Sequence, residues 1–79
     1  MSTKAYVLVE TAGGKSKEVL SKLRQLHGVV SADAVTGPYD LIAIIEGDSF
    51  PDIGDLVAVR IGGIKGITRT VTCLAIQIP

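Results

Sequence analysis

The distribution of apolar residues in the first third of the chain predicts a strand followed by a helix. Residues 4–11 are rich in β-branched and aromatic side chains and stop at a Gly-Gly pair, which is typical of a strand. Apolar residues then recur at steps of three and four, the spacing of one helix face, at Val19, Leu20, Leu23 and Leu26. Ser16 is a plausible N-cap, and Gly28 lies just past the end, where a left-handed residue often closes a helix. The other face is charged and is expected to be solvated.

The middle of the chain predicts a hairpin of two strands. Residues 29–37 alternate loosely between apolar and polar types and break at Gly37-Pro38, and residues 40–47 resume as a strand. This interpretation places Asp40 at a strand entrance, directly before the longest uninterrupted apolar run, Leu41 to Ile45.

The last part of the chain predicts a second helix and a final strand. The helix is expected to begin at Asp48-Ser49, with Ser49 as N-cap, Pro51 in the first turn and Asp52 completing a capping box with a shorter acid than usual. Its inner face is predicted to comprise Ile53, Leu56, Val57 and Arg60 or Ile61, and Gly62-Gly63 to end it. Residues 66–78, rich in β-branched types, are expected to form the long last strand.

This order of elements, βαββαβ, predicts an α+β fold of the ferredoxin-like kind in a single domain, residues 1–79. Four antiparallel strands form a sheet, and both helices pack on one of its faces. Strands covered on one face should alternate apolar and polar residues, yet residues 6–9 and 41–45 are apolar throughout. We therefore expect the second face to be covered by another copy, forming a homodimer by sheet-to-sheet packing. An unrelated partner could also cover it, but a symmetric self-contact is commoner.

Composition supports assembly. The chain has 79 residues, is 47% hydrophobic and has a mean hydropathy of +0.43. A domain of this size has little interior, and its core supplies only about 3–5 kcal/mol unless disulfides, a metal or oligomerisation add to it. Cys73 is the single cysteine and is expected to be a small buried hydrophobe, while His27 is the single histidine and is expected at the first helix's end or in solvent. Neither a disulfide nor a usual zinc site is available.

Charge and hydropathy limit the classes of partner that we expect for this chain. The chain has eight basic and eight acidic residues and three aromatics, whereas small nucleic-acid modules usually carry a basic face or stacking aromatics. The longest apolar run is far below the roughly 18–20 residues of a membrane span, and the first ten residues lack a signal-peptide layout. We expect a cytoplasmic protein without direct contact to nucleic acid or membrane.

Candidate catalytic motifs are weak. The stretch AGGKS, residues 12–16, follows a strand and opens a helix, but the phosphate-loop pattern requires a glycine where Val9 stands. The helix N-terminus could hold an anion weakly, although a loop-and-cap role is favoured. The sequence shows no nucleophile with an identifiable base, and the first loop has no C-x-x-C pair for a carried metal. The chain is therefore predicted not to be an enzyme and to need no cofactor.

The turn Thr36-Gly37-Pro38-Tyr39-Asp40 is the strongest candidate for a binding site. In a purely structural role, Gly37 and Pro38 shape the turn and Asp40 satisfies nearby backbone N–H groups. In a functional role, a glycine admits a ligand close to the backbone, exposed N–H groups receive a carboxylate, and the acid holds an ammonium. Those are the two charged ends of an amino acid. Arg69, Thr70 and Thr72 of the last strand add polar groups, although β-propensity explains the threonines as well.

The chain resembles the effector-binding (RAM) domain of the Lrp/AsnC family over essentially its whole length. The resemblance is carried by the first strand AYVLVET, the His-Gly-Val-Val step after the first helix, the T-G-x-Y-D core within VTGPYDLIAII, and the last strand ITRTVT. It implies dimers that face their sheets, rings of dimers, and amino-acid effectors at the contacts between dimers. Gly37, Tyr39 and Asp40 match the turn that grips the ligand's main-chain groups, and Thr70 and Thr72 match last-strand positions that approach from a neighbouring dimer.

Members of that family typically carry a helix-turn-helix before this domain, and the present sequence resembles the stand-alone members without it. The sequence therefore predicts an amino-acid sensor that oligomerises. An alternative is an assembly partner that associates with full-length Lrp/AsnC regulators and modulates their DNA binding. A third reading, a small dimeric ferredoxin-like enzyme, requires a polar cleft between helices and sheet, and the apolar inner helix faces count against it.

Overall fold

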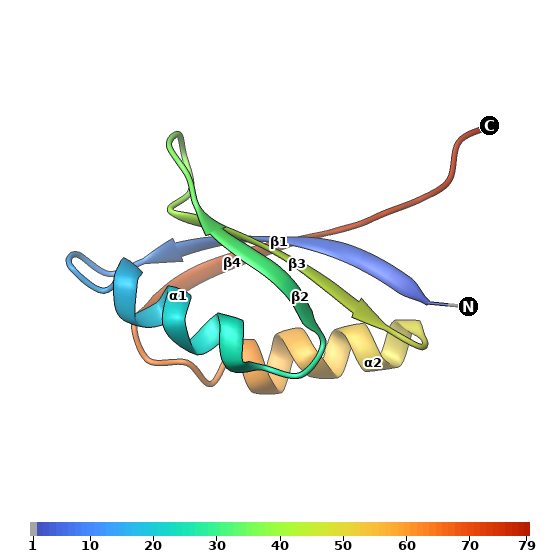
Figure 1. The fold of residues 1–79 in the computed structure, drawn as a ribbon, viewed down its shortest axis with the longest axis horizontal. Helices are drawn as coiled ribbons and strands as arrows, with labels where there is room; N and C mark the ends of the chain where they lie inside the picture. Colours follow the sequence, from blue (N-terminus) through green and yellow to red (C-terminus); the bar gives the residue numbers. More distant parts are fainter. Residues whose placement is uncertain (1) are drawn as a thin grey trace.

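The computed structural model describes residues 2–79, and its elements follow the predicted βαββαβ order (Figure 1). A π-helical segment, η1, directly continues the second α-helix. The bounds are β1 Thr3–Thr11, α1 Ser16–Gln25, β2 Val29–Ala34, β3 Leu41–Gly47, α2 Phe50–Asp55, η1 Leu56–Ile61 and β4 Ile67–Leu74. None of the helices in residues 2–79 combines the length and apolar character needed to span a membrane.

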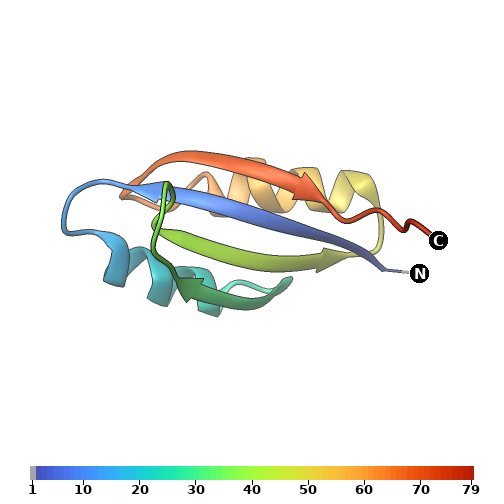
Figure 2. The same cartoon turned by 90° about the horizontal axis from the view of Figure 1, so that it is seen from above.

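The four strands form one antiparallel sheet in the order β2-β3-β1-β4. β1 lies in the middle, so Val7 of β1 is opposite both Ala43 of β3 and Thr72 of β4. Both helices lie on the same side of this sheet (Figure 1), and the view from above shows the strands with no helix in front of them (Figure 2). The predicted ferredoxin-like α+β fold is confirmed.

The core lies between the sheet and the helices. Alternate residues within β1 and β3 are fully buried there, because successive side chains of a strand point to opposite faces. They are Ala5, Val7, Val9, Leu41, Ala43 and Ile45. From α1, Val19 and Leu23 close this layer, as the helical spacing predicted. From the second helical segment, the buried residues are Ile53, Leu56 and Ile61.

The outer face of α1 is exposed, as predicted, and one of its residues fastens the helix to the sheet edge. Nε and Nη2 of Arg24 donate to the backbone oxygen of Ala32 at 3.0 and 2.8 Å. The same guanidinium lies 3.8 Å from the exposed carboxylate of Asp33. The hydrogen bonds hold α1 against β2, and the ion pair adds little because both groups are solvated.

The opposite face of the sheet, which we call the open face, is apolar and uncovered. Its central residues are Tyr6 and Leu8 of β1, Ile42 and Ile44 of β3, and Val71 and Cys73 of β4, which pair across the sheet. Tyr6 is 37% exposed, while its neighbour Val7 is fully buried under the helices. The prediction that Cys73 is buried is wrong for the single chain: Cys73 lies on the open face and is exposed.

Two predicted helix caps differ from the structure. Ser16 is the first helical residue rather than the N-cap, and its hydroxyl lies 2.7 Å from that of Thr11. Ser49 does occupy the N-cap position, but its hydroxyl donates to Asp52 Oδ2 at 3.1 Å and accepts no backbone N–H. In both cases another side chain competes for the hydroxyl that would cap the helix. Gly28 has the expected left-handed backbone, with φ +99°.

The second helix and the last strand also depart from the prediction. Leu56 and Ile61 are both buried although five residues apart, a spacing that the i→i+5 bonding of η1 accommodates; Arg60 is exposed. β4 ends at Leu74 instead of continuing to residue 78. Ala75 still donates its N–H to the oxygen of Lys4 at 2.9 Å, but β1 begins at Thr3, so the last strand has no further partner.

Candidate functional site

The turn between β2 and β3 stands above the open face of the sheet (Figure 1) and is closed by backbone hydrogen bonds. Val35 donates its N–H to the oxygen of Asp40 at 3.0 Å, and Asp40 donates its own to the oxygen of Val9 at 2.9 Å. Gly37 has φ +116°, a region that other residues rarely adopt, and the space where a Cβ would project is empty. Tyr39 is half-buried. The predicted turn is present, with empty space beside Gly37.

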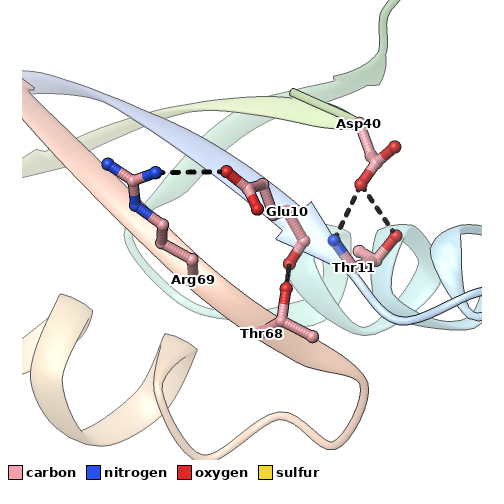
Figure 3. Close-up of polar contacts among 5 residues, drawn as sticks. All are labelled: Glu10, Thr11, Asp40, Thr68 and Arg69. Carbon is pink, nitrogen blue, oxygen red and sulfur yellow. Dashed lines mark hydrogen bonds and ion pairs between the residues drawn. The ribbon is translucent and has the colours of Figure 1, made fainter. Parts of the chain in front are cut away.

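Asp40 has a defined orientation. Its Oδ2 accepts the backbone N–H of Thr11 at 2.8 Å and the Thr11 hydroxyl at 3.2 Å (Figure 3). The Thr11 hydroxyl in turn lies 2.7 Å from that of Ser16 at the start of α1. One carboxylate oxygen thus joins the start of β3 to the end of β1 and, through Thr11, to the first turn of α1.

The other oxygen of Asp40 has a different environment. Figure 3 shows it pointing away from Thr11, and within residues 2–79 it receives no hydrogen bond. Asp40 is exposed. Asp40 has the expected structural role of accepting a backbone N–H. The N–H belongs to Thr11, which is 29 residues away in sequence, and not to a residue of the same turn. The carboxylate is therefore held in place through one of its two oxygens.

Thr70 and Thr72 of β4 lie apart from this turn. They are opposite Val9 and Val7 of β1 respectively, so they share the helix side of the sheet with those valines. Thr70 is half-buried and Thr72 exposed, because β4 is an edge strand. β1 lies between β3 and β4, and neighbouring strands are about 4.8 Å apart, so roughly 10 Å separate the backbone at Asp40 from that at Thr70. One chain does not bring the five predicted residues into one pocket.

The Arg69 side chain contacts Glu10 and not the turn. Its Nη1 lies 3.5 Å from Glu10 Oε2 on the open face, and the Thr68 hydroxyl donates to the backbone oxygen of Glu10 at 3.2 Å (Figure 3). The guanidinium therefore neutralises Glu10 and does not face Asp40. Glu10 and Thr11 are the residues that sequence reasoning missed. No local signal marks them, because their partners come from strands far along the chain.

The hollows of the described surface lie away from the turn. One cavity of about 410 Å³ is at the far end of β3, lined by the carboxylates of Glu46, Asp48, Asp52 and Asp55 together with His27 and Arg60. His27 is exposed there, as expected for a solvated residue at the helix end. Two further hollows between α1 and the loop before β4 share Lys22 and Lys65. No group of His, Cys, Asp or Glu side chains among residues 2–79 is arranged to hold a metal ion.

Comparison with solved structures shows where this fold is found. TTHA0845 from Thermus thermophilus superposes with a TM-score of 0.92 at 30% identity, covering 98% of this chain and 96% of that one. PHS023 from Pyrococcus horikoshii superposes with a TM-score of 0.88 at 36% identity, covering 99% and 93%. A transcriptional regulator from Neisseria meningitidis, solved as a complex with L-Met, superposes with a TM-score of 0.85 over 95% of this chain and 50% of its own. It is 16% identical, so that likeness shows the fold alone.

Comparison with curated proteins identifies regulators. An HTH-type transcriptional regulator of Pyrococcus furiosus, PF0250, is 27% identical over 78 residues, which are 95% of this chain and 52% of that protein. The regulator FL11 from the same organism is 27% identical over 74 residues, 94% and 48% of the two chains. The chain spans about half the length of the curated relatives it matches.

The family model for the Lrp/AsnC ligand binding domain matches residues 4–79. This family is a regulatory ligand-binding domain of transcriptional regulators and not an enzyme, in agreement with the prediction from the sequence. The chain belongs to the Lrp/AsnC ligand binding domain family.

Proposed function

We propose that this chain binds a free amino acid at a site shared between two dimers. Asp40 accepts the α-ammonium through the oxygen that Thr11 leaves available, and the backbone near Gly37 and Tyr39 receives the α-carboxylate. A neighbouring subunit supplies Thr70 and Thr72. The observation that carries the proposal is the exposed, oriented carboxylate of Asp40, with one oxygen engaged and the other pointing to solvent.

The orientation of Asp40 favours binding energetically. Two hydrogen bonds from Thr11 hold the side chain, so little rotamer freedom remains to be lost when a ligand arrives. An ammonium bound to a carboxylate forms a charge-assisted hydrogen bond, which is stronger than a neutral one. The missing side chain at Gly37 leaves space beside the turn for a ligand to approach the backbone.

The separation of Asp40 from the threonines supports a shared site. Thr70 and Thr72 lie on an edge strand, with β1 between them and the turn. We therefore assign them to the site of a neighbouring copy rather than to that of their own turn. A ligand that contacts two dimers stabilises their association by mass action. The ligand-binding character of the family supports a small-molecule ligand.

Assembly is the second part of the proposal. The open face supplies the dimer contact, with two sheets packed face to face, and dimers associate further into a ring. The apolar residues of the open face support this because a monomer would leave them in water. We place this assembly in the cytoplasm, because the curated relatives are transcriptional regulators.

Calorimetry against the twenty amino acids tests the site. At least one should release heat with the wild-type protein. Asp40→Asn keeps an oxygen for the Thr11 N–H but removes the charge, and we expect its affinity to fall about tenfold or more, which corresponds to roughly 1.4 kcal/mol. Asp55→Asn, which removes the charge of an exposed acid in the helical layer, is the matched control and should bind normally. Undiminished binding by Asp40→Asn would remove Asp40 from the site.

Native mass spectrometry with and without the bound amino acid tests the shared position of the site. The ligand should raise the population of species larger than a dimer. An assembly that never exceeds two chains is incompatible with a site between dimers, even if the chain binds an amino acid.

A second candidate function is assembly with full-length relatives. The chain matches about half of each curated HTH-type regulator. If the matching half folds in the same way, mixed dimers would use the same contact. A pull-down from cell lysate distinguishes the two functions. Co-purifying helix-turn-helix relatives favour the mixed assembly, and a homogeneous ring with bound amino acid favours the sensor.

A further inference from the structure

The segment Ala75–Pro79, which we call the C-terminal arm, follows the last strand, is apolar except for Gln77, and is tied to β1 through the backbone of Ala75. Ile76 and Ile78 are 76% and 80% exposed, more than the other large hydrophobic residues that the structure leaves in water. They are two positions apart in a segment that has no regular secondary structure. The arm has no charged side chain to favour its hydration.

The arm leaves the sheet in a definite direction. Its last tie to its own chain is the hydrogen bond from the Ala75 N–H to the oxygen of Lys4, next to the start of β1. Beyond this point the arm rises on the side of the sheet opposite the helices (Figure 1), past the end of the strands (Figure 2). No backbone hydrogen bond ties residues 76–79 to the rest of residues 2–79.

We propose that the C-terminal arm of one subunit packs its two isoleucines on the open face of a second copy, so that two subunits exchange arms across the dimer. This proposal rests on the sheet-to-sheet dimer of the proposed function and specifies an additional contact in it. The root of the arm adjoins the exposed pair Tyr6 and Cys73, so the arm extends the open face rather than forming a separate patch.

The dimensions fit this arrangement. Five extended residues span about 17 Å, and face-to-face sheets are about 10 Å apart, so the arm can cross from one sheet layer to the other with residues to spare. In a two-fold dimer each open face receives one arm, and the contact occurs twice. Burial of an isoleucine side chain typically contributes to association, because apolar surface leaves water.

The dimer dissociation constant, measured by sedimentation equilibrium without amino acid, tests the arm. The double variant Ile76→Ser, Ile78→Ser should raise it by about ten- to a hundredfold. The matched control is Phe50→Ser, Val59→Ser, which removes two comparably exposed hydrophobic residues, 67% and 63%, from the helical layer. It should leave the dissociation constant unchanged. Circular dichroism should show the wild-type fold in both variants.

Methyl NMR on dimers mixed from labelled and unlabelled chains locates the arm. We expect contacts between the Ile76 and Ile78 methyl groups of one subunit and those of Leu8, Ile42 or Ile44 of the other. Contacts only within one chain, or an arm variant that dimerises as tightly as wild type, would overturn the exchange. A monomeric wild-type protein would overturn the arm and the dimer together. Loss of amino-acid binding alone would refute only the proposed ligand, because neither arm measurement contains one.

Discussion

The two faces of the sheet carry similar apolar side chains in opposite surroundings. On one face Ile45 is fully buried beneath the helices, and on the other its neighbour Ile44 is only partly covered, by adjacent strands. Val7 and Tyr6 of β1 form the same contrast. The chain therefore has enough apolar side chains for two layers of packing but helices for only one. Folding of the single chain buries the helix-covered face and leaves the open face available for association.

The largest expected effect comes from truncation on the helix face. Ile45→Ala leaves a cavity in the core and should lower the free energy of unfolding by about 2–5 kcal/mol in urea denaturation. Ile44→Ala is the matched change on the open face. In dilute samples it should cost less than half as much, because Ile44 is then partly in water already. Equal losses at every protein concentration would contradict the contrast between the faces.

A charge on the open face should act on assembly rather than on folding. Ile44→Asp places one carboxylate from each subunit in the proposed dimer contact, and desolvating both is unfavourable. The dimer dissociation constant should rise by about a hundredfold or more, measured by sedimentation. The far-ultraviolet circular dichroism should stay that of the wild type. Dimers that persist unchanged with this substitution would show that the open face is not the contact.

The smallest effect is expected at the rim of the open face. Arg69 and Glu10 form an ion pair at 3.5 Å, but the arginine side chain is mostly in water. Because solvent screens such pairs, Arg69→Gln should change the free energy of unfolding by less than about 1 kcal/mol, and salt should reduce that change further. If Arg69→Gln lowered the free energy of unfolding of the monomer by several kcal/mol, the ion pair at the rim would contribute to the stability of the core. That result would contradict the contrast between the two faces.

Local patterns predicted the elements and their layers because they depend on neighbours in sequence. The spacing of Val19 and Leu23 requires only that a helix turns every 3.6 residues, and both are buried as expected. Gly37 and Gly28 were identified at turns, and both have the left-handed backbone that glycine tolerates. Continuous apolar residues in β1 and β3 predicted a second apolar face, which the structure confirms.

Side-chain partners of the expected helix caps were not fully predicted. The Ser16 hydroxyl contacts that of Thr11 from β1, and the Ser49 hydroxyl donates to the side chain of Asp52 in its own helix instead of accepting a backbone N–H. Cys73 lies in an apolar stretch, and the sequence did not reveal that its strand position places it on the open face. The π-helical turn after Asp55 allows both Leu56 and Ile61 to be buried. The α-helical repeat alone does not bring two residues at this spacing to the same side.

The candidate site also combines features set by neighbouring residues with contacts between residues far apart in sequence. The sequence by itself determined the turn, its glycine and its acid, because turn chemistry depends on a few consecutive residues. Only the tertiary structure decided that Asp40 is oriented by Thr11, since β1 and β3 must pair before the two residues meet. It also decided that Thr70 and Thr72 lie one strand away from the turn, because strand order is set by the packing of the whole sheet. Residue types are local properties of a chain, whereas the distances between them are fixed only when all four strands have assembled.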